Sequence, residues 1–69
     1  MPLSFADEGM QYQITRIGGA QEVRQHLADM GFNVGGNITV ISRIGENYIV
    51  KVKESRIGLS REMASKIMV

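Results

Sequence analysis

The sequence contains no cysteine and a single histidine among its 69 residues. Without cysteine the chain has no disulfide and no thiolate metal site, a composition that suits a reducing compartment such as the cytosol. Its first residues carry no basic segment and no apolar run of the about 7–15 residues that a signal peptide needs. No stretch approaches the roughly 18 apolar residues of a membrane span. We therefore expect a cytoplasmic protein that does not insert into a membrane.

An excess of charge of one sign is also missing. Eight lysine and arginine residues stand against seven aspartate and glutamate residues, which gives a formal net charge of +1. Proteins that bind phosphate backbones usually carry a stronger positive charge, so the composition does not support nucleic-acid binding. Hydrophobic residues make up 43% of the chain and charged residues 22%, close to ordinary globular values. A chain of this length forms one domain, and we expect residues 1–69 to fold as a single unit.

Catalytic groups are equally sparse. The chain has no cysteine, one histidine and no serine in a recognisable elbow, so the sequence does not assemble a nucleophile with an oriented base. Glu22, His26 and Asp29 share one flank of a predicted helix, and a ferrous or manganous ion in principle accepts such ligands. Three ligands on one exposed helix without supporting groups bind weakly, which favours a solvated flank instead. We expect a non-enzymatic protein with no bound metal and no cofactor.

Hydrophobic periodicity predicts the elements of the first half. Alternating residues predict a strand over 10–17, which ends at two glycines. From residue 20 the period changes, and Val23, Leu27 and Met30 form one apolar stripe of an amphipathic helix over 20–30. A strand followed by a single helix is thus expected before the glycine-rich centre of the chain.

The second half reads as short strands joined by tight turns. The predicted order is a strand over 37–42, a hairpin turn over 43–47, a strand over 48–52, a strand over 56–60, a one-turn helix over 61–65 capped by Ser60, and a strand over 66–69. Closure into a barrel removes the exposed edges of such short strands. We therefore predict a mainly β fold, a small closed barrel of about five strands with an inserted helix.

The glycines after the helix raise the question of a phosphate-binding loop. Such a loop places glycines between a strand and the start of a helix and includes a lysine, whereas residues 31–37 follow a helix and contain none. Gly31 instead fits a left-handed helix stop, with Phe32 folding back onto the last turn, and Gly35 fits the turn that follows. Gly58 is expected to leave room for a close backbone approach in its strand. These glycines are therefore predicted to be structural.

The order and spacing of several short motifs along nearly the whole chain resemble the ferrous iron transport protein A family, FeoA. The matching positions are Ile14, Ile17 and Gly19; Arg24, Leu27, Met30, Gly31 and Phe32; Gly35; Arg56, Ile57, Gly58 and Leu59; and Ile67 with Val69. The resemblance implies an SH3-like barrel and a cytosolic accessory of the membrane transporter FeoB, whose cytosolic part is a GTPase. Many relatives carry a proline-containing loop where this chain has the shorter segment 43–47.

Two partner hypotheses remain open from the sequence. For a monomer or weak homo-oligomer that binds FeoB, the expected contact residues are Gln21, Arg24, Gln25 and Ala28 on the helix and Arg43, Gly45, Glu46 and Asn47 in the hairpin. The alternative is a barrel that binds nucleic acid or acts like the C-terminal module of metal-dependent repressors. Its basic face would consist of Arg16, Arg43, Lys51, Lys53 and Arg56. That face lacks interleaved exposed aromatic residues for base stacking, so nucleic acid is not the expected partner.

Overall fold

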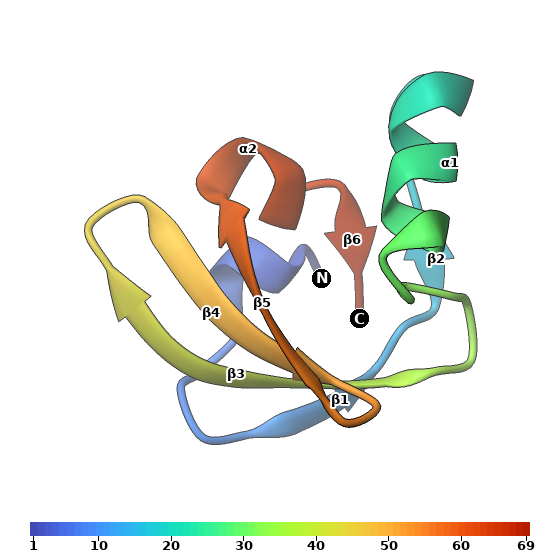
Figure 1. The fold of residues 1–69 in the computed structure, drawn as a ribbon. Coiled ribbons are helices and arrows are strands. Elements are labelled where there is room, and N and C mark those ends of the chain that lie inside the picture. Colours follow the sequence, from blue (N-terminus) through green and yellow to red (C-terminus); the bar gives the residue numbers. More distant parts are fainter.

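The computed structural model describes all residues from 1 to 69. In chain order the elements are the 3₁₀ helix η1 (Leu3–Phe5), strands β1 (Gln11–Gln13) and β2 (Arg16–Ile17), helix α1 (Gln21–Asp29), strands β3 (Asn37–Ile44), β4 (Asn47–Val52) and β5 (Ser55–Ser60), helix α2 (Arg61–Ala64) and strand β6 (Ile67–Met68). Helix α1 stands at one side of the strands, and the β3–β4 hairpin reaches to the other (Figure 1). The predicted mainly β fold with an inserted helix and a C-terminal helical turn is confirmed.

All strands pair in antiparallel fashion, in a four-stranded sheet of order β1-β3-β4-β5 and a two-stranded sheet of β2 and β6. The single strand predicted over 10–17 is wrong, because the chain leaves one sheet at Ile14 and enters the other. Ile14 is buried, and its backbone N–H and carbonyl bond to Gly36 and Gly35. No strand joins β5 back to β1, so hydrogen bonds do not close the SH3-like barrel. This differs from the closed barrel that the sequence predicts.

The core is built mainly from alternate residues of the strands. Three such side chains are buried in β4, as the alternation predicts: Tyr48, Val50 and Val52. In β3 the alternation buries Ile38 and Val40, and the register then shifts between Val40 and Ser42. Ile41, between these two residues, has no partner on β4. Such an unpaired extra residue, a β-bulge, bends a strand and increases its twist. Strand β3 continues beyond this shift to Ile44, two residues past its predicted end.

The N-terminal residues form part of the core, although no sequence pattern assigns them a role. Leu3 and Ala6 are fully buried and Ser4 is nearly so. The Tyr48 hydroxyl donates a 3.0 Å hydrogen bond to the Ser4 carbonyl. Sequence analysis missed η1 because three helical residues are too few to show a period. Phe5, the last residue of η1, stays on the surface.

The end of α1 confirms the predicted glycine stop. Gly31 has a φ angle of +104° and donates its N–H to the Ala28 carbonyl, 2.9 Å away. Phe32 donates its N–H to the Leu27 carbonyl, also at 2.9 Å, and its ring is fully buried. These two bonds satisfy carbonyls that the helix itself leaves free, which is the Schellman arrangement. The helix is thus stopped and its last turn is fixed to the core.

Other predicted details are confirmed in part. The Ser60 hydroxyl accepts a 3.2 Å hydrogen bond from the Met63 N–H and so caps α2. Gly19 and Gly35 have positive φ angles, whereas Gly58 does not. The predicted close approach of another backbone segment at Gly58 is wrong. A Cβ atom placed there would have its nearest neighbour 3.7 Å away, an ordinary contact, and that neighbour is the side-chain Cδ1 of Ile49.

Candidate functional site

Helix α1 offers the first of the two predicted partner-binding segments. Its only buried residue is Leu27, while Val23 is half-buried against the core. The side chains of Gln21, Arg24 and Gln25 are exposed, as binding to a partner requires. Ala28, the fourth predicted contact, is half-buried. The exposed part of the helix is therefore almost entirely polar.

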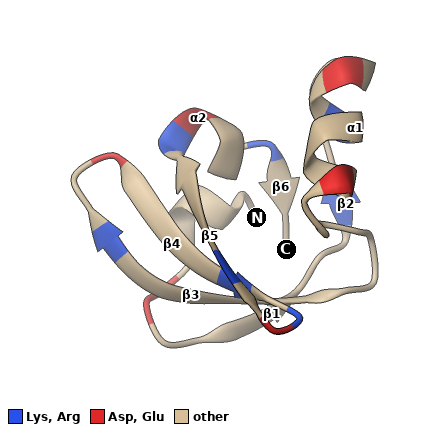
Figure 2. Ribbon diagram, in the orientation of Figure 1, with Lys and Arg blue, Asp and Glu red and all other residues tan.

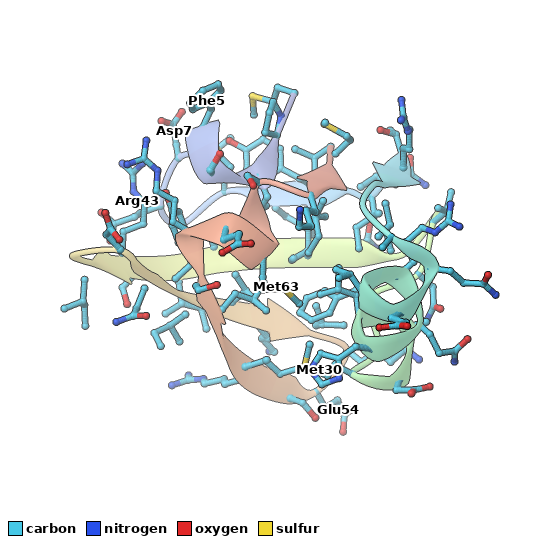
Figure 3. The ribbon with its side chains drawn as sticks, turned by 90° about the horizontal axis from the view of Figure 1, so that it is seen from above. Phe5, Asp7, Met30, Arg43, Glu54 and Met63 are labelled. Carbon is cyan, nitrogen blue, oxygen red and sulfur yellow. The ribbon has the colours of Figure 1, made fainter.

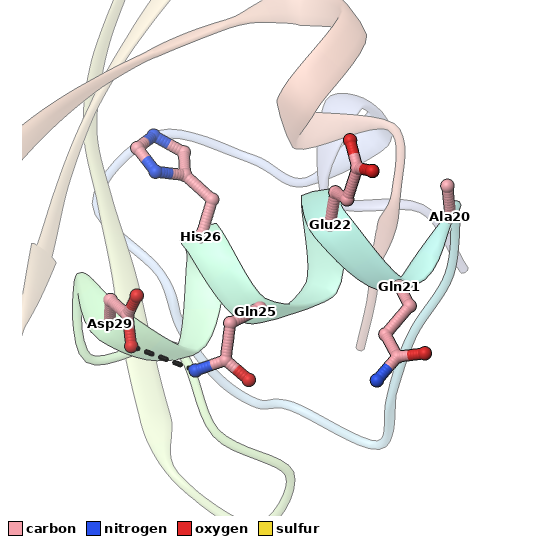
Figure 4. A pocket seen from close by; sticks show the side chains of 6 residues that line it. All are labelled: Ala20, Gln21, Glu22, Gln25, His26 and Asp29. Atoms are coloured by element: carbon pink, nitrogen blue, oxygen red, sulfur yellow. Dashed lines mark hydrogen bonds between the residues drawn. The ribbon is translucent and has the colours of Figure 1, made fainter.

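The flank of α1 that carries the candidate metal ligands is a shallow hollow on the helix surface (Figure 4). The Asp29 carboxylate accepts a 2.9 Å hydrogen bond from the Gln25 side-chain amide. Glu22 and His26 extend from the helix on the side away from this bonded pair (Figure 4). No three side chains of the histidine, cysteine or acidic types group closely enough to hold a metal ion. The geometry matches the solvated flank that the spacing favoured; the absence of a metal stays a prediction.

The tip of the β3–β4 hairpin is the second predicted segment. Arg43, Gly45, Glu46 and Asn47 are all exposed. Two hydrogen bonds fix the tip from two sides. The Arg43 N–H donates to the Glu8 side-chain carboxylate at 3.3 Å, and the Arg61 N–H donates to the Glu46 carbonyl at 2.8 Å. A turn that is held by two other segments of the chain presents its side chains in a defined arrangement.

Two apolar side chains at this end were missed by sequence reasoning. Phe5 is 67% exposed and Ile44 is 68% exposed. Figure 3 places Phe5 and Asp7 beside Arg43 at one end of the molecule. The one sequence signal for an exposed apolar group was Ile44, an isoleucine in an otherwise polar turn. Nothing in the sequence indicated that Phe5 lies near the hairpin. We define the hairpin-end surface as Phe5, Asp7, Glu8, Arg43, Ile44, Gly45, Glu46 and Asn47.

The two predicted segments do not form one surface. Helix α1 and the β3–β4 hairpin lie at opposite sides of the molecule (Figure 1). The protein measures 28 Å along its longest axis. A partner that covers one of these segments in a small interface therefore leaves the other free.

The five cations of the predicted basic face are also dispersed. Arg16 lies in β2, which belongs to the second sheet, and Arg43 lies at the hairpin tip. Lys51 and Arg56 are directly opposite each other on β4 and β5, with Lys53 in the turn between these strands. Figure 2 shows the blue segments on separate elements. Only three of the five cations share a region, so the structure does not provide the continuous basic face of the alternative hypothesis.

The architecture defines a small, mainly β domain of the SH3-like type. None of its helices is long and apolar enough to cross a membrane. The FeoA domain family matches residues 1–69, and the chain belongs to this family. The resemblance inferred from the order of the motifs is thereby confirmed.

Named relatives agree with this assignment. The chain is 37% identical over 68 residues to a candidate Fe(2+) transport protein A of Methanocaldococcus jannaschii, covering 99% of this chain and 83% of that protein. The crystal structure of an iron uptake regulatory protein, FeoA, has a TM-score of 0.90 and 26% identity, covering 97% of this chain and 91% of the other.

Two more distant structures share the fold. Stenotrophomonas maltophilia FeoA, described as a prokaryotic SH3 domain protein in complex with zinc, has a TM-score of 0.87 and 19% identity, covering 99% of this chain and 87% of the other. A manganese-dependent transcriptional repressor has a TM-score of 0.89 and 17% identity, covering 97% of this chain and 39% of the repressor. The same barrel therefore occurs both as most of a chain and as one module of a larger protein.

Proposed function

We propose that this protein is a non-enzymatic cytosolic accessory of ferrous iron uptake, which binds the GTPase-containing part of the membrane transporter FeoB. Membership of the FeoA family connects the chain to ferrous iron transport. A structural relative described as an iron uptake regulatory protein supports a regulatory role. A regulator acts by binding one state of its partner more tightly than another, so it needs a contact surface and no catalytic group of its own.

The observation that carries this proposal is the exposure of two large apolar side chains on the hairpin-end surface. Phe5 and Ile44 are exposed by about two thirds of their areas, and exposed charged residues lie in the same two segments: Asp7, Glu8, Arg43 and Glu46. Protein interfaces commonly combine apolar side chains with polar and charged ones at their rim. The exposed face of α1 carries no comparable apolar side chain. We therefore assign the main contact to the hairpin-end surface.

The size of the domain favours a single contact. A standard interface buries about 800 Å² on each partner. That area is under a fifth of the 4314 Å² of accessible surface of this protein. A patch of this size at the hairpin end does not reach α1 on the opposite side. Substitutions at the two segments should consequently have different effects on binding.

The test is a titration of the purified protein against the full-length transporter in detergent. Phe5→Ser and Ile44→Ser should each weaken binding at least fivefold, because each removes a large exposed apolar group from the proposed contact. Gln21→Ser on α1 is the matched exposed control and should bind like the wild type. All of these side chains are exposed, so the variants should keep the wild-type melting temperature.

Two results would contradict the proposal in different ways. No binding of the wild type at about 100 μM, where even contacts of about 5 kcal/mol are detected, would refute the transporter as the partner. Binding that is insensitive to Phe5→Ser and Ile44→Ser but lost with Gln21→Ser would move the contact to α1. A parallel titration with duplex and single-stranded nucleic acid tests the alternative partner.

A further inference from the structure

The outer face of the four-stranded sheet contains a polar hollow, which shares no residue with helix α1 or the hairpin-end surface. Its volume is about 400 Å³, and its lining residues are Gln11, Asn37, Thr39, Lys51 and Lys53. Gln11 is paired with Thr39 across β1 and β3, and Thr39 is paired with Lys51 across β3 and β4. Directly opposed residues point to the same face of a sheet, so these three side chains form one row across three strands.

Every side chain in this hollow can donate a hydrogen bond, and none is acidic. Lysine contributes an ammonium group, glutamine and asparagine contribute amide NH₂ groups, and threonine contributes a hydroxyl. None of the five takes part in a side-chain hydrogen bond within the protein. By contrast, the neighbouring Gln13 amide is bonded to the Gly35 carbonyl. The hollow thus collects free donors and two positive charges.

A third cation strengthens the positive field beside the hollow. Arg56 is directly opposite Lys51 on the neighbouring strand, and both side chains are exposed. Like charges in directly opposed positions destabilise a sheet. The chain as a whole has a net charge of only +1, so this is a local concentration of charge. A bound anion would relieve the repulsion between these groups.

We propose that the hollow binds a small phosphate-bearing molecule through its phosphate oxygens. A phosphate group brings several acceptor oxygens and about two negative charges, which match the amide, hydroxyl and ammonium donors around the hollow. Lysine is a common phosphate-binding residue and acts as a point charge. The volume lies within the range of small-molecule sites. This proposal is independent of binding to the transporter, because the hollow lies outside the hairpin-end surface.

Nucleic acid fits the hollow less well than a small molecule. A single strand is usually held by a longer basic groove together with aromatic residues on which its bases stack. Here the inward-facing Tyr48 is buried, Tyr12 is half-buried, and Phe5 lies at the hairpin end. The other arginines are on other elements, namely Arg16 in β2, Arg24 in α1, Arg43 in β3 and Arg61 in α2. The cations at the hollow are therefore limited to Lys51, Lys53 and the neighbouring Arg56, and they do not continue into a long basic groove.

The test is an NMR titration of the whole protein with inorganic pyrophosphate at low salt. Saturable shifts are expected for the side-chain amide signals of Gln11 and Asn37, with a dissociation constant on the order of 1 mM, as suits exposed charges. Lys51→Gln and Lys53→Gln should each weaken binding about threefold to fivefold. Arg61→Gln, which removes an exposed cation outside the hollow, should leave the dissociation constant unchanged. Thr39→Val should weaken binding while removing no charge.

Further titrations identify which class of phosphate compound binds and show which results would overturn the proposal. Tighter binding of a nucleoside triphosphate than of pyrophosphate, with the same shifted residues, would assign the ligand to the nucleotides; tighter binding of pyrophosphate would assign it to simple phosphates. Shifts at all surface cations alike, or equal affinity in Lys51→Gln and Arg61→Gln, would overturn the proposal. Preferential binding of a single-stranded oligonucleotide or of an acidic peptide would overturn it as well. Unchanged backbone spectra of the free variants establish that they are folded.

Discussion

The buried hydroxyl of Tyr48 donates a 3.0 Å hydrogen bond to the carbonyl of Ser4, 44 positions away in the chain. This bond joins β4 to the N-terminal segment, and Phe5 is the next residue along that segment. Arg43 is paired with Tyr48 across β3 and β4. One buried tyrosine therefore connects the two parts of the chain that together form the hairpin-end surface.

Replacing this tyrosine by phenylalanine removes the bond and keeps the ring. Tyr48→Phe should lower the free energy of unfolding by about 1 kcal/mol, because the buried Ser4 carbonyl loses its side-chain partner. For a domain of this size the melting temperature should fall by roughly 4–8 °C per kcal/mol. Calorimetry of the two proteins measures the difference. An unchanged melting temperature would mean that the bond makes no net contribution to stability.

Gly31 provides a test of the helix stop. Its φ of +104° disfavours any residue with a Cβ atom, although the space itself is open, since such an atom would lie 3.5 Å from Val52 Cγ1. Gly31→Ala should therefore cost about 1 kcal/mol of stability through backbone strain alone, and Gly31→Val should cost more. Gly58→Ala is the matched control without positive φ and should be close to neutral. Equal thermal midpoints for wild type and Gly31→Val would contradict the assignment.

Lys53 is the one non-glycine residue with a positive φ angle, at +56°. A side chain costs roughly 1–2 kcal/mol in this conformation, whereas glycine adopts it freely. Lys53→Gly should raise the free energy of unfolding by about 1 kcal/mol, even though glycine makes the unfolded chain more flexible. Urea denaturation measures the gain. A loss of stability would mean that the lysine side chain makes contacts that outweigh the strain.

The pair of Lys51 and Arg56 allows a test of charge repulsion across the sheet. Arg56→Glu replaces a repulsive pair by an attractive one and should raise the free energy of unfolding by about 0.2–1 kcal/mol at low salt. The gain should shrink at about 1 M salt, because the charges are exposed and screened. Arg56→Gln should give an intermediate value. Equal stability of all three proteins at low salt would show that the two cations do not interact.

Sequence reasoning succeeded where the signal is local. The helix stop at Gly31, the cap at Ser60 and the alternation in β4 each depend on neighbouring residues, and all three are confirmed. It failed where two distant segments decide the outcome. Ile14 ends β1 because it enters the core between two sheets, and a continuous alternating pattern does not show this. Phe5 likewise lies beside the hairpin because a tertiary hydrogen bond, from Tyr48 to Ser4, holds the N-terminal segment there. No local pattern shows this bond, so half of the residues of the hairpin-end surface were missed.

Charge reversal distinguishes the two predicted partner-binding segments by kinetics. Arg43 is exposed at the hairpin end beside Phe5, and Arg24 is exposed on α1, so each reversal should leave folding nearly unchanged. Charges at the rim of an interface mainly affect the association rate and its salt dependence. If the hairpin-end surface contacts the transporter, Arg43→Glu should change the association rate by about threefold or more at low salt, with the difference vanishing at high salt. The expected direction is slower association, as for the loss of an attractive cation.

Arg24→Glu, the matched control of equal charge change, should associate at nearly the wild-type rate in surface plasmon resonance with the captured transporter. The opposite pattern, a large effect of Arg24→Glu and none of Arg43→Glu, would place the contact on the exposed face of α1.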